Sequence, residues 1–445
     1  MKSLCSLLVV LCLLLSACSH VTPQGEGSGD SSTQPPAISV SPAKSTAAST
    51  SSAKSTEQAA TEKNLSATGE SSSEDAVPLT DLFLEDYDQL WQILEEDYPY
   101  WEYLKIKFPH LDEIRERFRE RTARAKVVGE FYKVLTQFFQ RLEFFGTLQP
   151  VQKDAYDVYY DLYVTGSPEY DLPEEVKAPF REVLTNPKVV EYYGTPKTDM
   201  SSTPDLKGPA PNVSYYDDCG ALRIRLQSFV QSSVARDKDV LAKSLEQYPD
   251  TKHIIFDIRG NYGGSVLYWI NNLVAPFGED IQWTMRSYYR DTPLVRPFFA
   301  GMASHPVSEL TEVPSWVQEF KLDRFFESSP FDIGSSIDTV PVSSRAKRWV
   351  LVDGGVFGTA DTFAAFCKDS GWATLVGKDT RGGSGEAGPI LTALHNTGII
   401  FCFDGEAAEG PGGVSSAVHG TAPDCICENS NEILAYCLEL IRSGR

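Results

Sequence analysis

Apolar residues recur at helical spacing between residues 82 and 145, with charged and amide residues between them. Three successive stripes are present: Tyr87, Leu90, Trp91, Leu94 and Tyr98; Leu111, Ile114 and Phe118; Phe131, Leu135, Phe138, Leu142 and Phe145. Side chains at this spacing share one face of a helix and are usually core. The pattern predicts a three-helix module within residues 77–150, followed by an insert or linker over 151–212.

From residue 213 the pattern changes to short apolar strands that alternate with helices. We predict strands at 221–227, 253–258, 348–352 and 373–376, and helices at 236–248, 266–274, 360–371 and 431–442. A strand, turn, helix and strand repeated in this order favour right-handed crossovers and a mostly parallel sheet. Residues 213–445 are therefore predicted to form an α/β core, which an insertion at 279–345 interrupts.

The chain begins with Lys2, a short apolar run up to Leu15, and then Ser16, Ala17 and Cys18. This order is typical of a secretory signal. The segment from Leu15 to Cys18 also resembles the bacterial lipobox, in which the cysteine is diacylated and becomes the new N-terminus. Residues 1–18 are thus predicted to be a lipoprotein signal, with the membrane as partner through Cys18 on the extracytoplasmic face. The alternative is an ordinary signal peptide with an incidental cysteine.

Residues 19–76 contain 22 Ser or Thr and no aromatic residue, which leaves too little apolar surface for a core. We interpret this segment as a disordered tether. Of the total net charge of −21, the tether accounts for −4 and Lys2 leaves with the signal, so residues 77–445 carry −18. A chain this acidic is not expected to bind nucleic acid.

Six cysteines remain after the signal and the tether: Cys219, Cys367, Cys402, Cys425, Cys427 and Cys437. Outside the cytoplasm they could form up to three disulfides, or they could be buried thiols. Cys425 and Cys427 with His419 fit no usual zinc spacing. We therefore expect neither a metal nor a cofactor.

Two glycine-rich turns follow apolar strands and are the candidates for chemistry. The first lies within 257–264 (Asp-Ile-Arg-Gly-Asn-Tyr-Gly-Gly), and the second spans 354–358 and leads into the helix predicted at 360–371. Neither contains the glycine pattern of a dinucleotide or nucleotide site. Backbone N–H groups of such turns can hold an oxyanion, so Gly263, Gly264 and Thr359 are candidate oxyanion or peptide-binding residues. Asp257 and Arg259 are interpreted as residues that fix the first turn.

The order of these features resembles the tail-specific, or C-terminal-processing, serine proteases and their tricorn-core and interphotoreceptor-retinoid-binding relatives. The matching segments are 142–147, against L-x-D-G-H-T; 257–264, against D-x-R-x-N-x-G-G; 358–364, against S-A-A-E-x-F-A; 376–382, against V-G-E-x-T-x-G; and 420–424, against G-x-x-P-D. The resemblance implies a crotonase-like (ClpP/crotonase type) βαβ core whose active site binds extended peptides.

The departures from this family fall on its catalytic positions. Gly358 stands in place of the nucleophilic Ser, and Gly146 in place of the His. Gly383 stands where one branch has a Lys, and Ala417 where the triad branch has its Glu. Glycine can neither attack a carbonyl nor accept a proton. The sequence therefore predicts a catalytically inactive, peptide- or protein-binding pseudoprotease.

Two alternatives stay open. An active serine or threonine endopeptidase would need relocated catalytic groups, for which Thr359 is a weak substitute beside the missing nucleophile, and for which Ser265, Ser384, Lys378 and His419 are further candidates. A surface scaffold would instead have a filled cleft. An open space between Gly146, Gly263 and Gly358 would support peptide binding, whereas aromatic side chains such as Phe144, Phe145 or Phe357 in that space would favour the scaffold.

Overall fold

A computed structural model describes residues 77–166, 172–197, 208–279, 281–333, 340–383, 385 and 388–444. The signal, Cys18 and the tether therefore lie outside the described residues, and so does Ser384. From Leu79 onward the described residues belong to one unit. Within them, no helix combines the length and the apolar character needed to cross a bilayer.

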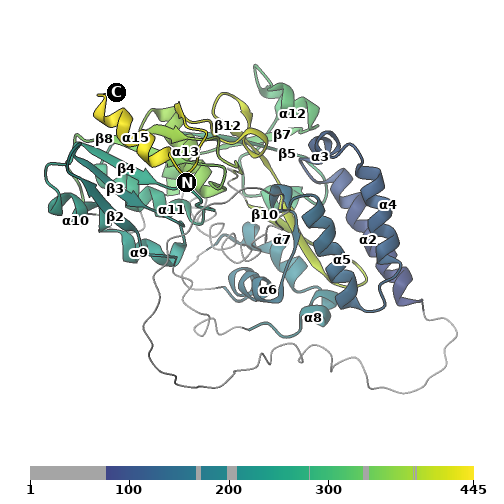
Figure 1. The fold of residues 1–445 in the computed structure, drawn as a ribbon. Helices are drawn as coiled ribbons and strands as arrows, with labels where there is room; N and C mark the ends of the chain where they lie inside the picture. The colour runs from purple at the N-terminus through teal and green to yellow at the C-terminus, as the bar shows by residue number, and fades with distance from the viewer. Residues whose placement is uncertain are drawn as a thin grey trace, which may run out of the picture. The chain divides into compact units, whose positions relative to one another are not determined.

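The predicted parallel sheet is present, in the order β14-β9-β8-β4-β3-β2. Its strands are β14 (Cys425–Ile426), β9 (Thr374–Gly377), β8 (Lys347–Val352), β4 (His253–Asp257), β3 (Ala221–Arg225) and β2 (Asn212–Tyr216). All neighbouring pairs are parallel except β2 with β3. Because parallel strands need crossovers, helices cover both faces, as Figure 1 shows.

One face of this sheet is covered by α11 (Val266–Trp269) and α13 (Thr359–Ser370), and the opposite face by α15 (Ile433–Arg442). Successive strand residues point to opposite faces of the sheet. Ile254 and Val350 pack with α13, while Ile255 and Leu351 pack with α15. The segment predicted as one helix at 236–248 is divided into two shorter helices, α9 (Val234–Asp237) and α10 (Val240–Gln247). The helix predicted at 266–274 continues from α11 as a π-helix, Ile270–Val274.

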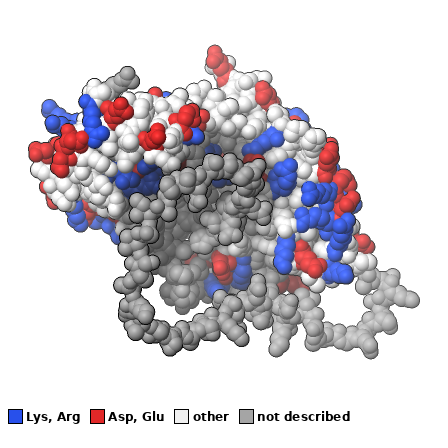
Figure 2. All heavy atoms as spheres, in the orientation of Figure 1, with Lys and Arg blue, Asp and Glu red and all other residues white. Residues whose placement is uncertain are grey.

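The N-terminal helical module has four helices rather than the predicted three. They are α2 (Leu79–Glu96), α3 (Trp101–Lys107), α4 (Leu111–Thr122) and α5 (Val128–Arg141). The extra helix, α3, has only seven residues and buries Trp101 and Leu104, too few positions to show a helical period. On the solvent side of α4, Arg and Glu alternate, and Figure 2 shows both charges interleaved over α2 and α4.

Two further sheets were not predicted. An antiparallel five-stranded sheet has the order β13-β12-β5-β7-β6, from β13 (Val414–Ser415), β12 (Ala407–Gly410), β5 (Met285–Tyr289), β7 (Arg324–Ser328) and β6 (His305–Pro306). A three-stranded sheet, β1-β11-β10, comprises β1 (Gln149–Pro150), β11 (Ile400–Asp404) and β10 (Pro389–Ala393). The segment 279–345 thus supplies strands β5 to β7 and helix α12 (Ser315–Glu319), and its sheet is completed by residues after 406.

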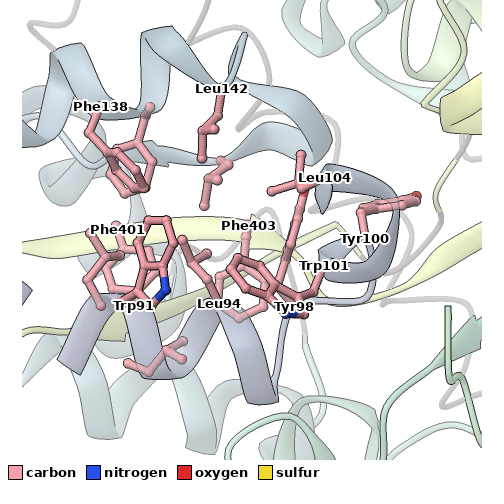
Figure 3. Packing of buried hydrophobic residues seen from close by; sticks show 14 of the residues in the cluster. Trp91, Leu94, Tyr98, Tyr100, Trp101, Leu104, Phe138, Leu142, Phe401 and Phe403 are labelled. Atoms are coloured by element: carbon pink, nitrogen blue, oxygen red, sulfur yellow. The ribbon is translucent and has the colours of Figure 1, made fainter. Parts of the chain in front are cut away.

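The helical module packs on these two smaller sheets. Figure 3 shows Trp91, Leu94 and Tyr98 facing Phe401 and Phe403 of β11, with Phe138 of α5 on the other side of the same cluster. The segment 151–212 is more helical than a linker, with α6 (Lys153–Tyr160), α7 (Glu174–Leu184) and α8 (Pro187–Tyr193). These helices cover one face of β10 and β11, while the helical module packs on the other face. Strand β11 therefore lies between the helical module and the 151–212 segment.

Candidate functional site

The corner at Gly358 connects strand β8 to helix α13. Gly358 has φ 58° and ψ −129°, a conformation that residues with side chains rarely adopt, and it gives α13 no side-chain cap. Its N–H donates to the carbonyl of Gly382 over 2.9 Å. The first N–H groups of a helix have no partner inside the helix, so α13 begins with donors directed toward this corner.

The 260–264 turn packs directly against this corner. The Phe357 N–H donates to the Asn261 carbonyl over 3.0 Å, and the buried Asn261 side chain accepts from the Gly263 N–H over 2.9 Å. A Cβ on Gly263 would lie 2.8 Å from the backbone nitrogen of Thr359 and 2.9 Å from the Phe357 carbonyl. Only glycine allows this approach, so the structure brings Gly263, Gly264, Gly358 and Thr359 together.

Thr359, which the sequence offered as a candidate substitute nucleophile, uses its hydroxyl to hold this arrangement. Its Oγ1 donates to the Gly264 carbonyl over 2.7 Å, in a buried position. Ser265 caps α11, because its Oγ accepts from the Leu267 N–H over 3.2 Å. Lys378 pairs with Glu428 at 3.7 Å, and His419 is exposed at the end of α14 (Ser416–His419). Thr359 and Ser265 thus hold the local backbone, and Lys378 and His419 lie at the surface.

The Gly383 and Ala417 positions lie on the other side of the corner. A Cβ on Gly383 would lie 2.5 Å from the ring of Phe357, and the centre of that ring lies 5.2 Å from the Arg381 guanidinium. A Cβ on Gly382 would overlap the Ser416 carbonyl and would lie 3.2 Å from the Cα of Ala417. Ala417 is therefore adjacent to the segment that bonds Gly358, while the Phe357 ring occupies the space that a side chain at 383 would need.

Gly146 is surrounded by aromatic side chains. A Cβ at this position would lie 2.5 Å from the Tyr98 hydroxyl oxygen and 2.8 Å from the Tyr100 ring. Tyr98 donates to the Phe145 carbonyl over 2.7 Å, which fixes its hydroxyl against the turn. The nearest neighbours of Gly146 are thus these two tyrosines, whereas Gly263 and Gly358 are close to each other.

A half-buried carboxyl beside Gly146 was missed in the sequence. Asp404, at the end of β11, accepts from the Thr147 hydroxyl over 2.5 Å. Burial raises the pKa of Asp404 to about 6, although the Thr147 hydrogen bond lowers it. Glu406, two residues on, is buried. Burial raises the pKa of the Tyr100 hydroxyl well above its usual value, and both acids raise it further. The sequence shows two acidic residues directly after an apolar strand, but nothing in the local sequence indicates that they lie in the interior.

Asp257 fixes the first turn through three arginines. Arg223 and Arg259 each donate two hydrogen bonds to its carboxylate, at 2.6 to 2.9 Å, and Arg225 donates one over 2.7 Å. Burial would raise the pKa of Asp257, but the guanidinium of Arg259, with those of Arg225 and Arg223, lowers it to about 2. Arg223 and Arg225 alternate along β3 beside β4, a pairing that only the sheet register reveals.

A second buried carboxylate, Asp361, connects the remaining family segments. It accepts from the hydroxyls of Thr380 over 2.5 Å and Ser416 over 3.0 Å. Thr380 also accepts from the Thr421 N–H over 2.6 Å. The helix after Gly358, the segment after β9 and the segment at 420–424 are therefore held by one polar network.

Among the residues that the structure describes, no three His, Cys, Asp or Glu side chains form a group that could hold a metal ion. No disulfide joins the six cysteines. Cys219, Cys425, Cys427 and Cys437 border the α15 face of the parallel sheet, whereas Cys367 and Cys402 are buried in two other clusters.

Comparison with known proteins identifies the family. The model of "Peptidase family S41" matches residues 220–426. Distantly similar solved structures include a lipoprotein from Streptococcus agalactiae, with 12% identity over 83% of this chain and 98% of that chain and a TM-score of 0.43. Mature CPAF is similar at 13% identity over 82% of this chain and 98% of that chain, with a TM-score of 0.44. The tricorn protease is a third, with 15% identity over 50% of this chain and 18% of that chain and a TM-score of 0.27. No curated protein matches the chain. Residues 220–426 are therefore a domain of peptidase family S41, with the mixed α/β, ClpP/crotonase-like core of that family and a helical region before it.

Proposed function

We propose that this protein is a member of peptidase family S41 that binds an extended peptide segment without cleaving it, and that a lipid on Cys18 holds it at the outer face of a bacterial membrane. The observation that carries the proposal is the loss of both catalytic side chains. Gly358 offers no nucleophile, and Gly146 offers no base. Removing any member of a catalytic unit already abolishes most of its rate.

The surroundings of Gly146 support the loss of activity independently of the sequence. A histidine at this position would meet the Tyr98 hydroxyl and the Tyr100 ring at its first side-chain atom. Both tyrosines are buried, and Tyr98 is bonded to the Phe145 carbonyl. The space for a general base is thus taken by other side chains, so a base cannot be restored by one substitution.

The backbone that could hold a peptide is retained. The N-terminus of α13 carries a partial positive charge, and Gly358 leaves it without a side-chain cap. The Gly263 and Gly264 turn lies against it, with no side chain between the two backbones. The Gly263 N–H already donates to the Asn261 side chain and the Gly358 N–H to the Gly382 carbonyl, so a carbonyl or carboxylate oxygen of a peptide would be held by the first N–H groups of α13. This supports binding of a peptide main chain at the glycine turns.

A surface scaffold is the second candidate, because aromatic rings occupy part of the former site. Phe357 covers the Gly383 position, and Tyr98 and Tyr100 cover the Gly146 position. If these rings leave no room for a peptide, the five-stranded sheet formed with the 279–345 segment would make the contacts instead.

Two glycine variants test the binding site. Gly263→Ala places a methyl group 2.8 Å from the Thr359 nitrogen, so it should separate the two turns and weaken binding of peptides from a random library at least tenfold in fluorescence anisotropy. Gly260→Ala is the matched control. It lies in the same turn, with φ 71°, and its added Cβ would meet nothing within 4 Å. If the unaltered protein binds no peptide, the result favours the surface scaffold.

A fluorophosphonate probe tests the absence of catalysis. The expected result is no covalent labelling of the purified protein and no hydrolysis of unstructured protein substrates. Covalent labelling at Thr359, Ser265 or Ser384 would instead establish an active enzyme with a relocated nucleophile.

A further inference from the structure

Three arginines gather on the α15 face of the parallel sheet, toward the carboxyl ends of β3 and β4. Arg223 and Arg225 alternate along β3. Arg223 is the register partner of Ile255, which packs against α15, so both arginines point to that face of the sheet. Arg259 follows β4 and shares the carboxylate of Asp257 with them. The cluster therefore lies on the face opposite α13.

The cluster holds more positive charge than its carboxylate neutralises. Among the residues that the structure describes, Asp257 is the only acid that pairs with these three guanidinium groups. Asp353, an acid of the second turn, accepts instead from the N–H groups of Gly260 and Gly355. Three positive charges thus face one negative charge, in a domain whose net charge is −18. Like charges held together at a partly buried position repel each other, and an anion would offset that repulsion.

Two of the arginines keep unused hydrogen-bond donors. Arg225 donates from Nη1 to Asp257, and its Nε and Nη2 have no partner in the described part of the chain. Arg223 donates from Nε and Nη2, which leaves its Nη1 likewise unused. The Arg225 and Arg223 side chains are 24% and 16% exposed, so a ligand can approach them from solvent. Arg259, in contrast, uses all three nitrogens, because its Nη1 donates to the Ser430 carbonyl.

The edge strand β2 places uncharged polar groups beside these donors. Asn212 is the register partner of Arg225, and Ser214 is that of Arg223. Side chains opposite one another in a sheet share a face, so the Asn212 amide and the Ser214 hydroxyl flank the two arginines. Helix α15 packs on β8 and β9, and the only β3 residue in its cluster is Ala221, at the other end of that strand. Helix α15 thus leaves the carboxyl end of β3 uncovered.

We propose that Arg223 and Arg225 bind a phosphate group on this face of the sheet, with Asn212 and Ser214 at its edge. A guanidinium presents its N–H donors in a planar fork that matches two oxygens of a phosphate. A phosphate group carries between one and two negative charges near neutral pH, so it suits the excess charge of the cluster. The Asp257 carboxylate holds both guanidinium groups in place before a ligand arrives. The site lies on the face opposite α13, so it does not rest on the proposed peptide binding.

Isothermal titration calorimetry of the full mature protein tests the site at about pH 7.5 and constant ionic strength, where phosphate is largely dianionic. Inorganic phosphate and glycerol 3-phosphate should each bind saturably, with a dissociation constant of about 1 mM or below. Tighter binding of glycerol 3-phosphate would assign a phosphate ester as the ligand, and tighter binding of inorganic phosphate would assign the free ion. Acetate should bind at least about tenfold more weakly, because it has fewer oxygens and less charge. Equal binding of acetate would overturn the proposal in favour of a carboxylate site.

Arg225→Gln removes the guanidinium with the most unused donors. It should weaken phosphate binding at least about tenfold, because hydrogen bonds to charged groups are the stronger ones. Arg442→Gln is the matched control, since it makes the same charge change on α15, where Arg442 pairs with Asp218 at 2.7 Å on the surface. This control should bind phosphate like the unaltered protein. The proposal is overturned if phosphate shows no saturable binding, or if the two variants bind it equally well.

Arg225→Lys provides a second test if Arg225→Gln fails to fold. Lysine keeps a positive charge for Asp257 but offers no planar fork, so phosphate affinity should still fall about fivefold. An affinity equal to that of the unaltered protein would contradict recognition by the guanidinium.

Discussion

Asp257 is the residue on which the first glycine turn depends, because one buried carboxylate holds three guanidinium groups. Asp257→Asn would leave Arg223, Arg225 and Arg259 close together without their counter-charge. Removing one partner of a buried ion pair costs about 3–5 kcal/mol. We expect a loss of that size in the free energy of unfolding from urea titration, while Asp217→Asn, on the surface, should change it by less than about 0.5 kcal/mol. A loss below about 1 kcal/mol for Asp257→Asn would contradict the structural role.

The same carboxylate predicts how stability depends on acid. The pKa of Asp257 is about 2 when folded and 3.8 ordinarily, so its contribution is present above pH 4 and is lost as the pH falls toward 2. That shift corresponds to about 2 kcal/mol. Unfolding free energies measured from pH 5 to pH 2 should therefore fall less steeply for Asp257→Asn than for the unaltered protein. Parallel curves would show that the carboxylate is not ionised in the folded state at these pH values.

At this scale the sequence shows which residues stand at the motif positions, but it does not show which side chains surround them. Gly146, Gly358 and Ala417 follow from motif alignment. The tyrosines against Gly146 could not be predicted, because Tyr98 and Tyr100 precede it by 48 and 46 residues and only tertiary packing brings them to it. The raised pKa of Asp404 likewise depends on burial, which the local sequence does not show.

At the scale of elements, the polar network around Asp361 keeps α13 aligned with the segments after β9 and β13. Thr380→Val removes a hydroxyl that donates to Asp361 and accepts from the Thr421 N–H. Both buried groups would lose a partner, so the expected loss of unfolding free energy is about 2–3 kcal/mol in urea titration. Thr136→Val is the matched control, because the Thr136 hydroxyl bonds within its own helix, α5, to the Tyr132 carbonyl. Equal losses for the two variants would show that the network contributes nothing specific.

The elements themselves were predictable where their pattern is local. The α/β alternation of residues 213–278 and 346–377 indicated the parallel sheet, because each crossover is read from contiguous sequence. The five-stranded sheet was not predicted. Its strands β5 and β7 are separated by 34 residues, and β12 comes from beyond residue 406, so only tertiary structure shows that they pair.

At the scale of the whole molecule, the acidic charge bears on how the protein is held at a membrane. Residues 77–445 carry a net charge of −18, and the face in Figure 2 shows basic side chains interleaved with acidic ones, with no large basic patch among the described residues of that face. Anionic lipid headgroups would repel such a domain. The lipid proposed on Cys18 would hold the protein at a membrane without help from charge, since two acyl chains are sufficient for stable anchoring.

The proposed lipid anchor predicts which treatments release the protein from a membrane. In cells of a host that processes lipoproteins, the unaltered protein should stay with membranes through a wash in 1 M NaCl, because salt screens charge and leaves acyl chains in place. Detergent should release it, and mass spectrometry of its N-terminal peptide should find acylated Cys18. Cys18→Ala should be secreted or retained as an unprocessed precursor. Cys12→Ala, in the apolar run of the same signal, is the matched control and should stay membrane-bound. Release of the unaltered protein by salt, or an unmodified N-terminus, would replace the lipid anchor with an ordinary signal peptide.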